Sequence, residues 1–477
     1  MFTFLSPPSI EAIHNAALRI LNETGVVINH AGARDLLTAH GARLEKNRVQ
    51  IPPDLVEKCI ASAGKKVSVR GRGPSTRTGQ AAAAKHLGDG NLYFHNLGGA
   101  RDVLDPLTGT KRLATVQDVR DSTRLLDALE NCHTLTPFFT PCDVPGDLMS
   151  LAMYRHALPH TTKPLQGPGV QYAPEARAAV RMAEVIGEPR EILTLAVSPV
   201  SPLTLPDHEV EAIFEIARLG IAFGALPCPT AGATAPMSIA GALAQQHAES
   251  LMCIVLTQLV QPGLPIIYCG RLAMMEARTG VSVWGGVELA LASAATVGLG
   301  HRYGFSVNVY GFSTNAHSLD LQNGFERGLN AAIPALAGAD ELSGIGEMEA
   351  GVSGSFAQMV ADNEFAGSIL RLKKGFEVND DSLAVELFDP VMGGSRNFLG
   401  QKHTMKYLRA GEVLLTKFAE RGTWESWERG GRLELARRAQ AEAEKILREH
   451  RVEPLEERQE NELDKILNAA EEEMKKK

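Results

Sequence analysis

Short apolar runs alternate with longer amphipathic stretches along most of this chain. Eight apolar runs have the length and continuity of buried strands. They cover residues 92–96, 134–140, 164–170, 192–198, 222–227, 265–270, 305–311 and 341–346. A stretch with apolar residues at helical spacing follows each run, at 115–131, 145–157, 174–186, 207–219, 237–260, 286–303, 320–337 and 356–374. Eight strand-helix units predict an α/β fold, the (β/α)8 TIM barrel.

A doubly wound open sheet is the alternative fold for such an alternation. It would need a glycine-rich phosphate-binding turn after an early strand. Residues 95–99, HNLGG, follow the first apolar run and lack the G-x-G-x-x-G spacing. The closed barrel is therefore the preferred fold.

Two extensions flank the alternating part. Residues 1–84 predict a mixed lead-in, with helices near 7–24, 31–40 and 53–63 and short strands near 26–28, 48–51 and 66–70. The barrel is expected to span 85–400. Residues 401–477 are rich in charge and predict C-terminal helices at 402–421 and 433–450, followed by a charged tail that is solvated or bridges subunits.

Composition narrows the class of protein. A formal net charge of −8 argues against a nucleic-acid surface, so small-molecule or protein partners are expected. No bilayer-spanning apolar segment and no basic start followed by an apolar core is evident, which predicts a cytoplasmic location. The six cysteines contain no C-x-x-C pair. We expect reduced, mostly buried thiols; the alternative, a zinc site, lacks a ligand cluster.

Polar residues gather where the last two predicted strands end. Asn315 and His317 follow the seventh strand, and Glu347 and Glu349 follow the eighth. Ligands in α/β folds bind at the carboxyl ends of strands, so these residues fall where a site is expected. Glu349 and His317 are the candidate catalytic residues. Asp320 is explained equally well as a helix N-cap.

Other strand ends supply candidate substrate-binding residues. Together with Asn315 and Glu347, these candidates are Tyr93, His95, Tyr268, Arg271, Phe312 and Gln322. Aromatic rings with Glu347 or Glu349 would form a box for a quaternary ammonium, each ring contributing roughly 0.5 to 2 kcal/mol. Ordinary core packing is the alternative for each ring. Arg271 or His95 could hold a substrate carboxylate.

Several long motifs resemble a known family. They are YGFSTNAHSLDLQNGFE, IPALAGADELSGIGEMEAGVSGSFAQMVADNE, and the C-terminal HTMKYLR and WESWERGG. In this order they resemble the trimethylamine methyltransferase (MttB) family, from the opening IHNAALRILNETGV to about residue 450. The resemblance implies a barrel enzyme that removes a methyl group from an amine. It also implies that the acceptor is the Co(I) corrinoid of a separate carrier protein, with no cofactor bound tightly by this chain.

The resemblance also bears on the substrate. Archaeal trimethylamine enzymes contain pyrrolysine, whereas this chain has only standard residues. Family members without pyrrolysine act on quaternary amines such as glycine betaine, proline betaine, carnitine or γ-butyrobetaine, which implies a similar substrate here, with glycine betaine preferred. A quaternary amine leaves as a neutral tertiary amine, so no general acid needs to protonate it. This suits a site without an evident acid-base pair. The D-x-H-x-x-G signature of cobalamin carriers is absent, because Tyr93 stands where an aspartate is required.

Two other functional classes stay open at this stage. One is a barrel hydrolase or lyase that uses Glu347 or Glu349 as general base, with or without a divalent ion. The other is a non-catalytic protein that binds quaternary amines on the same scaffold. The sequence also leaves open whether the chain forms a homo-oligomer.

Overall fold

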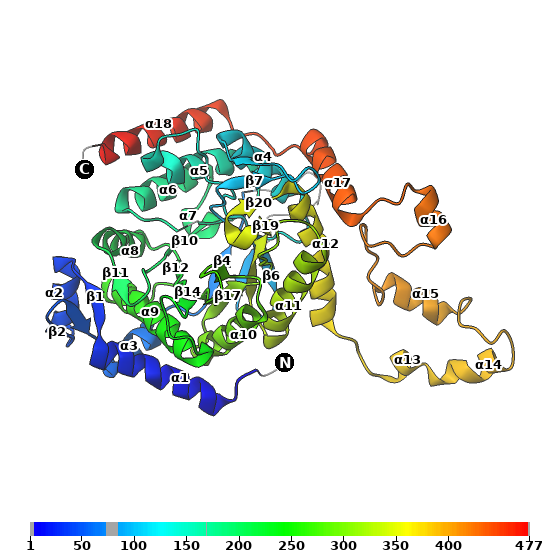
Figure 1. Ribbon diagram of the computed structural model, residues 1–477, viewed down its shortest axis with the longest axis horizontal. Coiled ribbons are helices and arrows are strands. Elements are labelled where there is room, and N and C mark those ends of the chain that lie inside the picture. The colour runs from blue at the N-terminus through cyan, green and yellow to red at the C-terminus, as the bar shows by residue number, and fades with distance from the viewer. Residues whose placement is uncertain (1–3, 73–83, 168, 476–477) are drawn as a thin grey trace.

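The computed structural model describes residues 4–72, 84–167 and 169–475, and a barrel of parallel strands forms its centre (Figure 1). Seven strands lie side by side in the order β6 (Tyr93–Asn96), β18 (Glu341–Ile345), β17 (Ser306–Tyr310), β14 (Ile266–Gly270), β12 (Phe223–Ala225), β10 (Leu193–Val197) and β9 (Leu165–Gln166). The second predicted run, 134–140, supplies the eighth position and closes the ring through isolated parallel bridges, from Thr134 to His95 and from Leu135 to Leu165. The predicted barrel is therefore confirmed.

Helices cover the outside of the barrel (Figure 1). They are α4 (Val116–Ala128), α5 (Met149–Ala157), α6 (Ala173–Ile186), α8 (Asp207–Leu219), α9 (Ile239–Val260), α10 (Val287–Arg302), α11 (Leu321–Ala337) and α12 (Phe356–Lys374). Each falls in a stretch that the periodicity predicts as helical. Asp320 accepts a hydrogen bond from the Asn323 N–H at the start of α11, so its role as an N-cap is confirmed.

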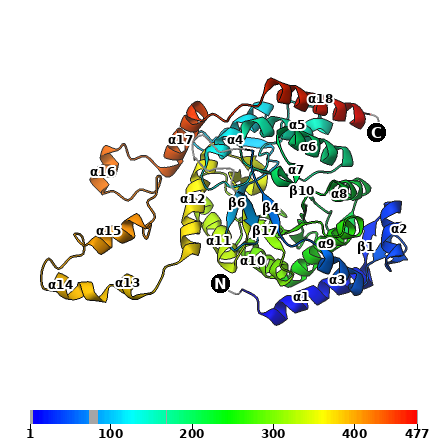
Figure 2. The same cartoon turned by 180° about the vertical axis from the view of Figure 1, so that it is seen from behind.

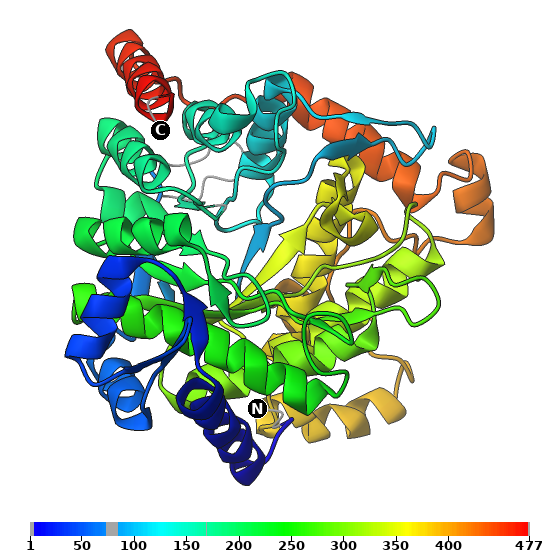
Figure 3. The ribbon, with the colours of Figure 1, turned by 60° about the vertical axis from the view of Figure 1, so that its left-hand side comes forward.

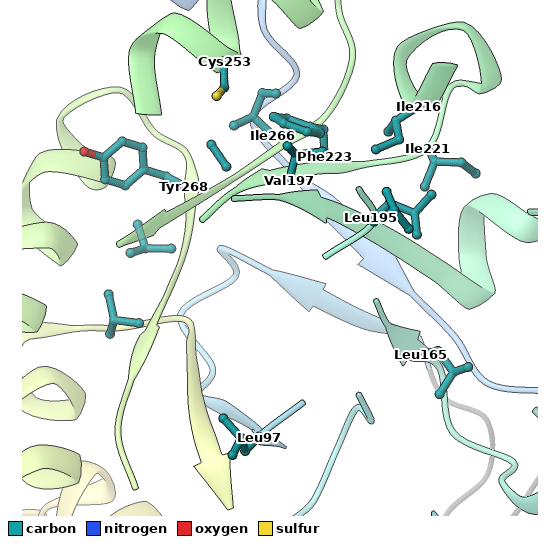
Figure 4. Close-up of a cluster of buried hydrophobic side chains, with 14 of the residues drawn as sticks. Leu97, Leu165, Leu195, Val197, Ile216, Ile221, Phe223, Cys253, Ile266 and Tyr268 are labelled. Carbon is teal, nitrogen blue, oxygen red and sulfur yellow. The ribbon is translucent and has the colours of Figure 1, made fainter. Parts of the chain in front are cut away.

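Strand side chains alternate between the helices and the barrel interior. Outward residues such as Leu195, Phe223 and Ile266 are fully buried against the helices, and Figure 4 shows part of this cluster. Burying such a side chain contributes about 1.5 to 3 kcal/mol. Inward residues include Asn308 and Glu341, which are polar and buried. The apolar core thus lies between strands and helices, and the barrel interior is free to carry polar chemistry.

The N-terminal extension packs mainly along α9, on the outside of the barrel (Figure 3). It comprises α1 (Pro7–Arg19), a π-helical turn (Ile20–Thr24), β1 (Val26–Ile28), α2 (Ala31–Ala39), β2 (Arg43–Glu45), β3 (Arg48–Gln50), α3 (Pro53–Ser62), β4 (Val67–Val69) and β5 (Lys85–Leu87). The β4–β5 hairpin buries Val67, Val69 and Leu87 against Ile267 and Cys269 of the barrel. The hairpin therefore plugs the amino end and leaves the carboxyl end as the entrance. The sequence did not predict β2 or β5.

The C-terminal part first leaves the barrel and then returns to it (Figures 1 and 2). Residues 375–434 form an arm with α13 (Asp380–Leu383), α14 (Phe388–Met392), α15 (Lys402–Arg409) and α16 (Trp424–Arg429). The predicted helix at 402–421 ends early, because Gly411 adopts a left-handed φ of 76°. α17 (Leu435–Glu449) then packs against α12.

The charged tail is not a solvated helix. α18 (Glu457–Met474) packs against α6 and buries Leu463, Ile466 and Ala470. Arg155 of α5 binds Glu460 at 2.8 Å and Asp464 at 2.7 Å. The expectation of a solvated tail was wrong, since three apolar residues at helical spacing suffice to dock one face of a helix. A bridge to a second subunit stays a prediction.

Three general expectations can be compared with the described part of the chain. No described helix is long and apolar enough to cross a membrane. All six cysteines are free and four of them are buried, which confirms the reduced thiols. Within the same residues, no group of three or more His, Cys, Asp or Glu side chains is arranged to hold a metal ion.

Candidate functional site

A hydrogen-bonded layer inside the barrel centres on Glu341. Its Oε1 accepts from Thr134 Oγ1 at 2.8 Å, its two oxygens accept from Gln166 Nε2 at 2.7 Å, and its Oε2 accepts from Asn308 Nδ2 at 2.6 Å. Asn308 Nδ2 also lies 2.8 Å from Nε2 of His95, a predicted substrate contact. Burial lowers the pKa of His95. With its polar atoms paired, this layer fixes the strands that carry the site.

Arg271 connects this layer to the carboxyl end of the barrel. It is buried, and its guanidinium donates to the Asn308 carbonyl at 3.0 Å and to the Asn308 side chain. The same guanidinium lies 5.0 Å from the centre of the Tyr310 ring. Because its donors already have protein acceptors, Arg271 supports Tyr310 from below the entrance.

Glu347 is a buried carboxyl close to Tyr310. Ser313 Oγ donates to its Oε1 at 2.8 Å, and its Oε2 has no hydrogen-bond partner among the described residues. Burial raises the pKa of Glu347 to about 8, against the opposing influence of the nearby Arg327 charge and of hydroxyl groups. The Tyr310 and Trp284 rings lie 5.4 Å apart. Glu347 is therefore mostly protonated at pH 7.

Glu349 and His317 lie together at the exposed rim, as expected from the sequence. Glu349 Oε1 is 3.5 Å from His317 Nδ1, and its Oε2 accepts from Lys111 Nζ and Ser353 Oγ, both at 2.6 Å. Burial acts to raise the pKa of Glu349, but Lys111 and Ser353 hold it below its ordinary value. Glu349 also has a left-handed φ of 54°. Such strain costs about 1 to 3 kcal/mol and persists only where neighbours fix the backbone.

A small sheet brings Lys111 to this rim. It runs in the order β19 (Glu347–Met348), β20 (Ser353–Gly354), β7 (Asp102–Leu104) and β8 (Lys111–Leu113). The sheet joins the segment after β18 to the segment after β6. The sequence does not predict a role for Lys111, because nothing local distinguishes it from a solvated lysine.

Three predicted residues shape the loops instead of facing an opening. Asn315 Oδ1 accepts from the N–H groups of Trp284 at 2.8 Å and Gly285 at 2.7 Å. Gln322 Nε2 donates to Glu326 at 2.9 Å, and the buried Phe312 ring lies 5.6 Å from the ring of Phe94. These contacts hold the segment that carries His317.

Two predicted substrate contacts lie away from the entrance. Tyr93 is the first residue of β6, at the amino end, and its hydroxyl lies 3.5 Å from Asp89. Tyr268 points outward to α9, where its hydroxyl lies 2.7 Å from His247 Nδ1 (Figure 4). Strand alternation explains the error for Tyr268, because the inward positions of β14 are Ile267 and Cys269. Neither tyrosine belongs to the candidate site.

A cavity of about 510 Å³ opens at the carboxyl ends of the first strands. Gly98, Gly99, Thr140, Gly169 and Ser198 line its barrel side, and Gly146, Asp147, Met149, Ser150, Met153, Val170, Gln171, Tyr172, Glu175 and Glu209 line the rest. Its described wall thus has three carboxyl groups and no Lys, Arg or His. The sequence did not predict this wall, because it comes from α5, α6, α8 and the ends of the first four strands and not from the last two strands.

Glu209 is the unusual group in this wall. It is buried, and its Oε2 has no hydrogen-bond partner in the described part of the chain; the same holds for the nearby Ser150 Oγ. Burial raises the pKa of Glu209 to about 7. Burial also raises the pKa of Glu175, but its Oε2 accepts from the N–H groups of Gln171 and Tyr172 at 2.8 and 3.2 Å. Glu209 is therefore the buried carboxyl of this wall that is left to interact with a ligand.

The cavity and the aromatic pair both lie at the carboxyl end of the barrel. A methyl group added at Gly351 would lie 3.8 Å from both Leu97 and the Tyr310 hydroxyl. Leu97 directly precedes Gly98 in the cavity wall. This end of the barrel thus carries an acid-lined cavity, the Tyr310 and Trp284 rings, and the rim residues Glu349 and His317; we refer to it as the mouth.

Comparison with known proteins agrees with this architecture. The model of the trimethylamine methyltransferase (MTTB) family matches residues 1–475. A trimethylamine methyltransferase MttB of Desulfitobacterium hafniense is 30% identical over 461 residues, covering 95% of this chain and 91% of the relative. A glycine betaine methyltransferase of the same species is 27% identical, covering 94% and 92%. Among solved structures, the Methanosarcina barkeri monomethylamine methyltransferase (MtmB) aligns with a TM-score of 0.53 at 13% identity, covering 93% of this chain and 89% of that chain, which is a likeness of fold alone. With its family model matched over nearly the whole length, the chain belongs to the trimethylamine methyltransferase (MTTB) family, whose named members are methyltransferases.

Proposed function

We propose that this protein transfers a methyl group from a quaternary amine, glycine betaine in the first instance, to the Co(I) corrinoid of a separate carrier protein. Family membership supports methyl transfer, and one relative is named for glycine betaine. The observation that carries the choice of a cationic substrate is the mouth cavity, lined by three carboxyl groups and by no described basic side chain.

The cavity wall suits a quaternary ammonium group. Such a group carries a permanent charge and offers no N–H donor, so carboxylates, aromatic faces and polarisable sulfur are its natural neighbours. Glu209, Tyr172 and the two methionines Met149 and Met153 supply these contacts on one wall. A primary or secondary ammonium would instead demand hydrogen-bond acceptors on every side.

The reaction itself asks little acid-base chemistry of the protein. The Co(I) nucleophile attacks the methyl carbon, the carbon–nitrogen bond breaks, and its electron pair stays on nitrogen. The amine leaves neutral, and the methyl group ends on cobalt, now Co(III). Because the positive charge fades as the bond breaks, a very strong ion pair in the ground state would slow the step.

The remaining mouth residues take positioning roles in this proposal. Glu349 and His317 stand at the rim, where the methyl carbon has to face the incoming cobalt. Lys111, paired with Glu349 there, is the cation towards which a betaine carboxylate would point. Tyr310 and Trp284 contribute ring faces, and His95 and Arg271 hold the layer beneath.

The test is a screen of quaternary amines with free Co(I) cobalamin, followed through the visible spectrum. We expect methyl-Co(III) and one equivalent of dimethylglycine when glycine betaine is supplied. Trimethylamine, choline and a reaction without corrinoid are the controls. Dimethylglycine formed without corrinoid would contradict the proposal. Betaine binding without methyl-cobalt, in the presence of reductant and active carrier, would favour a binding protein instead.

A further inference from the structure

Helix α11 has its polarity reversed relative to an ordinary surface helix. Its solvent side carries Leu321, Phe325, Leu329 and Leu336, which are 85%, 56%, 43% and 38% exposed. Its two charged residues, Glu326 and Arg327, are buried. A barrel helix facing water normally shows charged residues outside and apolar residues inside. An uncharged apolar stripe running the length of a helix marks a contact surface.

The arm, residues 375–434, shows a second apolar surface. It stands away from the barrel in both Figure 1 and Figure 2. Exposed apolar side chains recur along it, including Phe376, Val378, Val385, Leu399, Leu415 and Trp424, each more than 60% exposed. Within this fully described segment only Val391 and Phe418 are buried apolar residues. The arm therefore has almost no core of its own.

Polar contacts nevertheless fix the shape of the arm. Lys406 Nζ lies 2.6 Å from Asp381, and the Tyr407 hydroxyl donates to the same carboxylate at 2.9 Å. A cavity of about 770 Å³ between α13 and α15 is lined in part by Leu383, Val385 and Leu387. Charged and polar side chains line the rest, namely Asp380, Asp381, Glu386, Lys402, His403 and Lys406. An ordered hook that presents apolar side chains beside polar ones is suited to receive a helix face, which is a known mode of recognition.

The position of the arm indicates its occupant. Lys373, at the end of α12, donates to the Gly90 carbonyl at 2.9 Å, and Lys417 lies 3.5 Å from Glu130. Gly90 and Glu130 both precede barrel strands, so the arm is rooted at the amino end. A carrier that delivers cobalt to the mouth docks at the opposite end. This step rests on the proposed function; the next does not.

Both apolar surfaces belong to the same chain. A two-fold axis lets each copy supply one arm and one α11, so that both surfaces are covered twice in one closed assembly. The α11 stripe carries no charge that would select a charged partner. From these observations we infer that the protein forms a homodimer in which the arm of each copy covers the outer face of α11 of the other.

The experiment is a mass measurement by light scattering on the full chain at micromolar concentration. We expect twice the 51.3 kDa chain mass. Phe325→Glu on α11 and Leu399→Glu on the arm should each weaken the dimer about 100-fold or more, because each places a carboxylate in an apolar contact. Both sites are exposed in one chain, so circular dichroism should show intact folding. Leu44→Glu on β2, equally exposed but remote, is the matched control.

Mixing the two variants tests the pairing itself. In a mixed dimer, the intact arm of the Phe325→Glu chain meets the intact α11 of the Leu399→Glu chain. One of the two arm–α11 contacts is then unaltered, so we expect dimers to form again on mixing. Four results would overturn the inference: a monomeric wild type, a dimer insensitive to both variants, no recovery on mixing, or a monomer that uses these residues to bind the carrier. None of these readouts depends on methyl transfer.

Discussion

Replacing Glu209 with glutamine tests the mouth cavity directly. The substitution keeps the shape of the side chain and removes its negative charge. Glu209 Oε2 has no hydrogen-bond partner among the residues described, and the pKa of its carboxyl is raised to about 7 by burial. A bound quaternary ammonium would be the missing counter-charge and would draw the carboxyl into its ionised form.

The magnitude follows from simple electrostatics. Two unit charges about 5 Å apart, at an effective dielectric constant of about 20, attract by about 3 kcal/mol. After some loss to desolvation, the variant should bind the cation about 10- to 100-fold more weakly at pH 8. For the wild type, the ionised fraction of Glu209 rises from about one tenth at pH 6 to about nine tenths at pH 8. Its affinity should therefore rise about tenfold over that interval.

Calorimetry measures both effects without any corrinoid. Tetramethylammonium and glycine betaine are titrated into wild type and variant at pH 6, 7 and 8, in buffers with different ionisation enthalpies. The wild type should release about half a proton per bound cation at pH 7, and the variant much less. Glu215→Gln on the same helix, which alters a carboxyl that pairs with Arg177 at 3.0 Å and does not line the cavity, is the matched control.

A flat affinity profile in the wild type would refute the reasoning. So would a Glu209→Gln variant that keeps the wild-type slope and proton release. Glu175 is the remaining buried carboxyl of the wall with a raised pKa, and it retains its two backbone N–H donors in the variant. A small residual slope is therefore compatible with the role of Glu209.

Three further outcomes are expected. Glu347 has a folded-state pKa of about 8, above its ordinary value, so its contribution to stability is present at low pH and is lost as the pH rises towards 8. The variant Glu347→Gln should therefore show a smaller fall in melting temperature between pH 6 and pH 8.5 than the wild type. An unchanged fall would contradict this. Arg327→Met leaves the fully buried Asp362, paired with it at 2.9 Å, without its cation and should destabilise the fold by about 3 to 5 kcal/mol in denaturant titrations. As the control, Arg302→Met removes the more exposed pair with Glu11 and should cost at most about 1 kcal/mol. Similar losses in the two variants would contradict the larger contribution of the buried pair. Glu349→Gln should slow methyl transfer to cobalamin at least about tenfold. Its effect on stability should stay below about 1 kcal/mol, because the pair of Glu349 with Lys111 is partly exposed. Unimpaired transfer would show that Glu349 takes no part in the reaction.

The barrel could be predicted because its signals are local. Apolar runs, amphipathic stretches and helix caps such as Asp320 each lie within a few neighbouring residues. The same locality placed His317 and Glu349 at one rim, since both follow adjacent strands of one sheet. The β2 strand was missed because RLE is short and wholly exposed, so no apolar alternation marks it.

The wrong predictions concern the direction in which a side chain points and the element against which a helix packs. Tyr268 was assigned to the site because it lies near a strand end, yet the two-residue period of the strand turns it towards α9. Charge dominates the composition of the tail and predicts a solvated helix, although Leu463 and Ile466 pack one face of that helix against α6. In both cases the decisive quantity was which side of an element faces its neighbour, and this depends on how the elements pack.

Glu209 marks the limit of sequence reasoning most clearly. In the sequence it is an acid in the first turn of a helix, where a glutamate is favoured by the helix dipole and calls for no further explanation. What singles it out in the fold is a missing partner: a buried oxygen without a donor, on the wall of a cavity that holds no described basic side chain. A group can be recognised as unpartnered only when all its neighbours in space are known. For Glu209 these neighbours come from α5, α6, α8 and four strand ends. A buried carboxyl without a counter-charge lowers the stability of the fold. A ligand that supplies that charge binds the folded state and offsets this loss of stability.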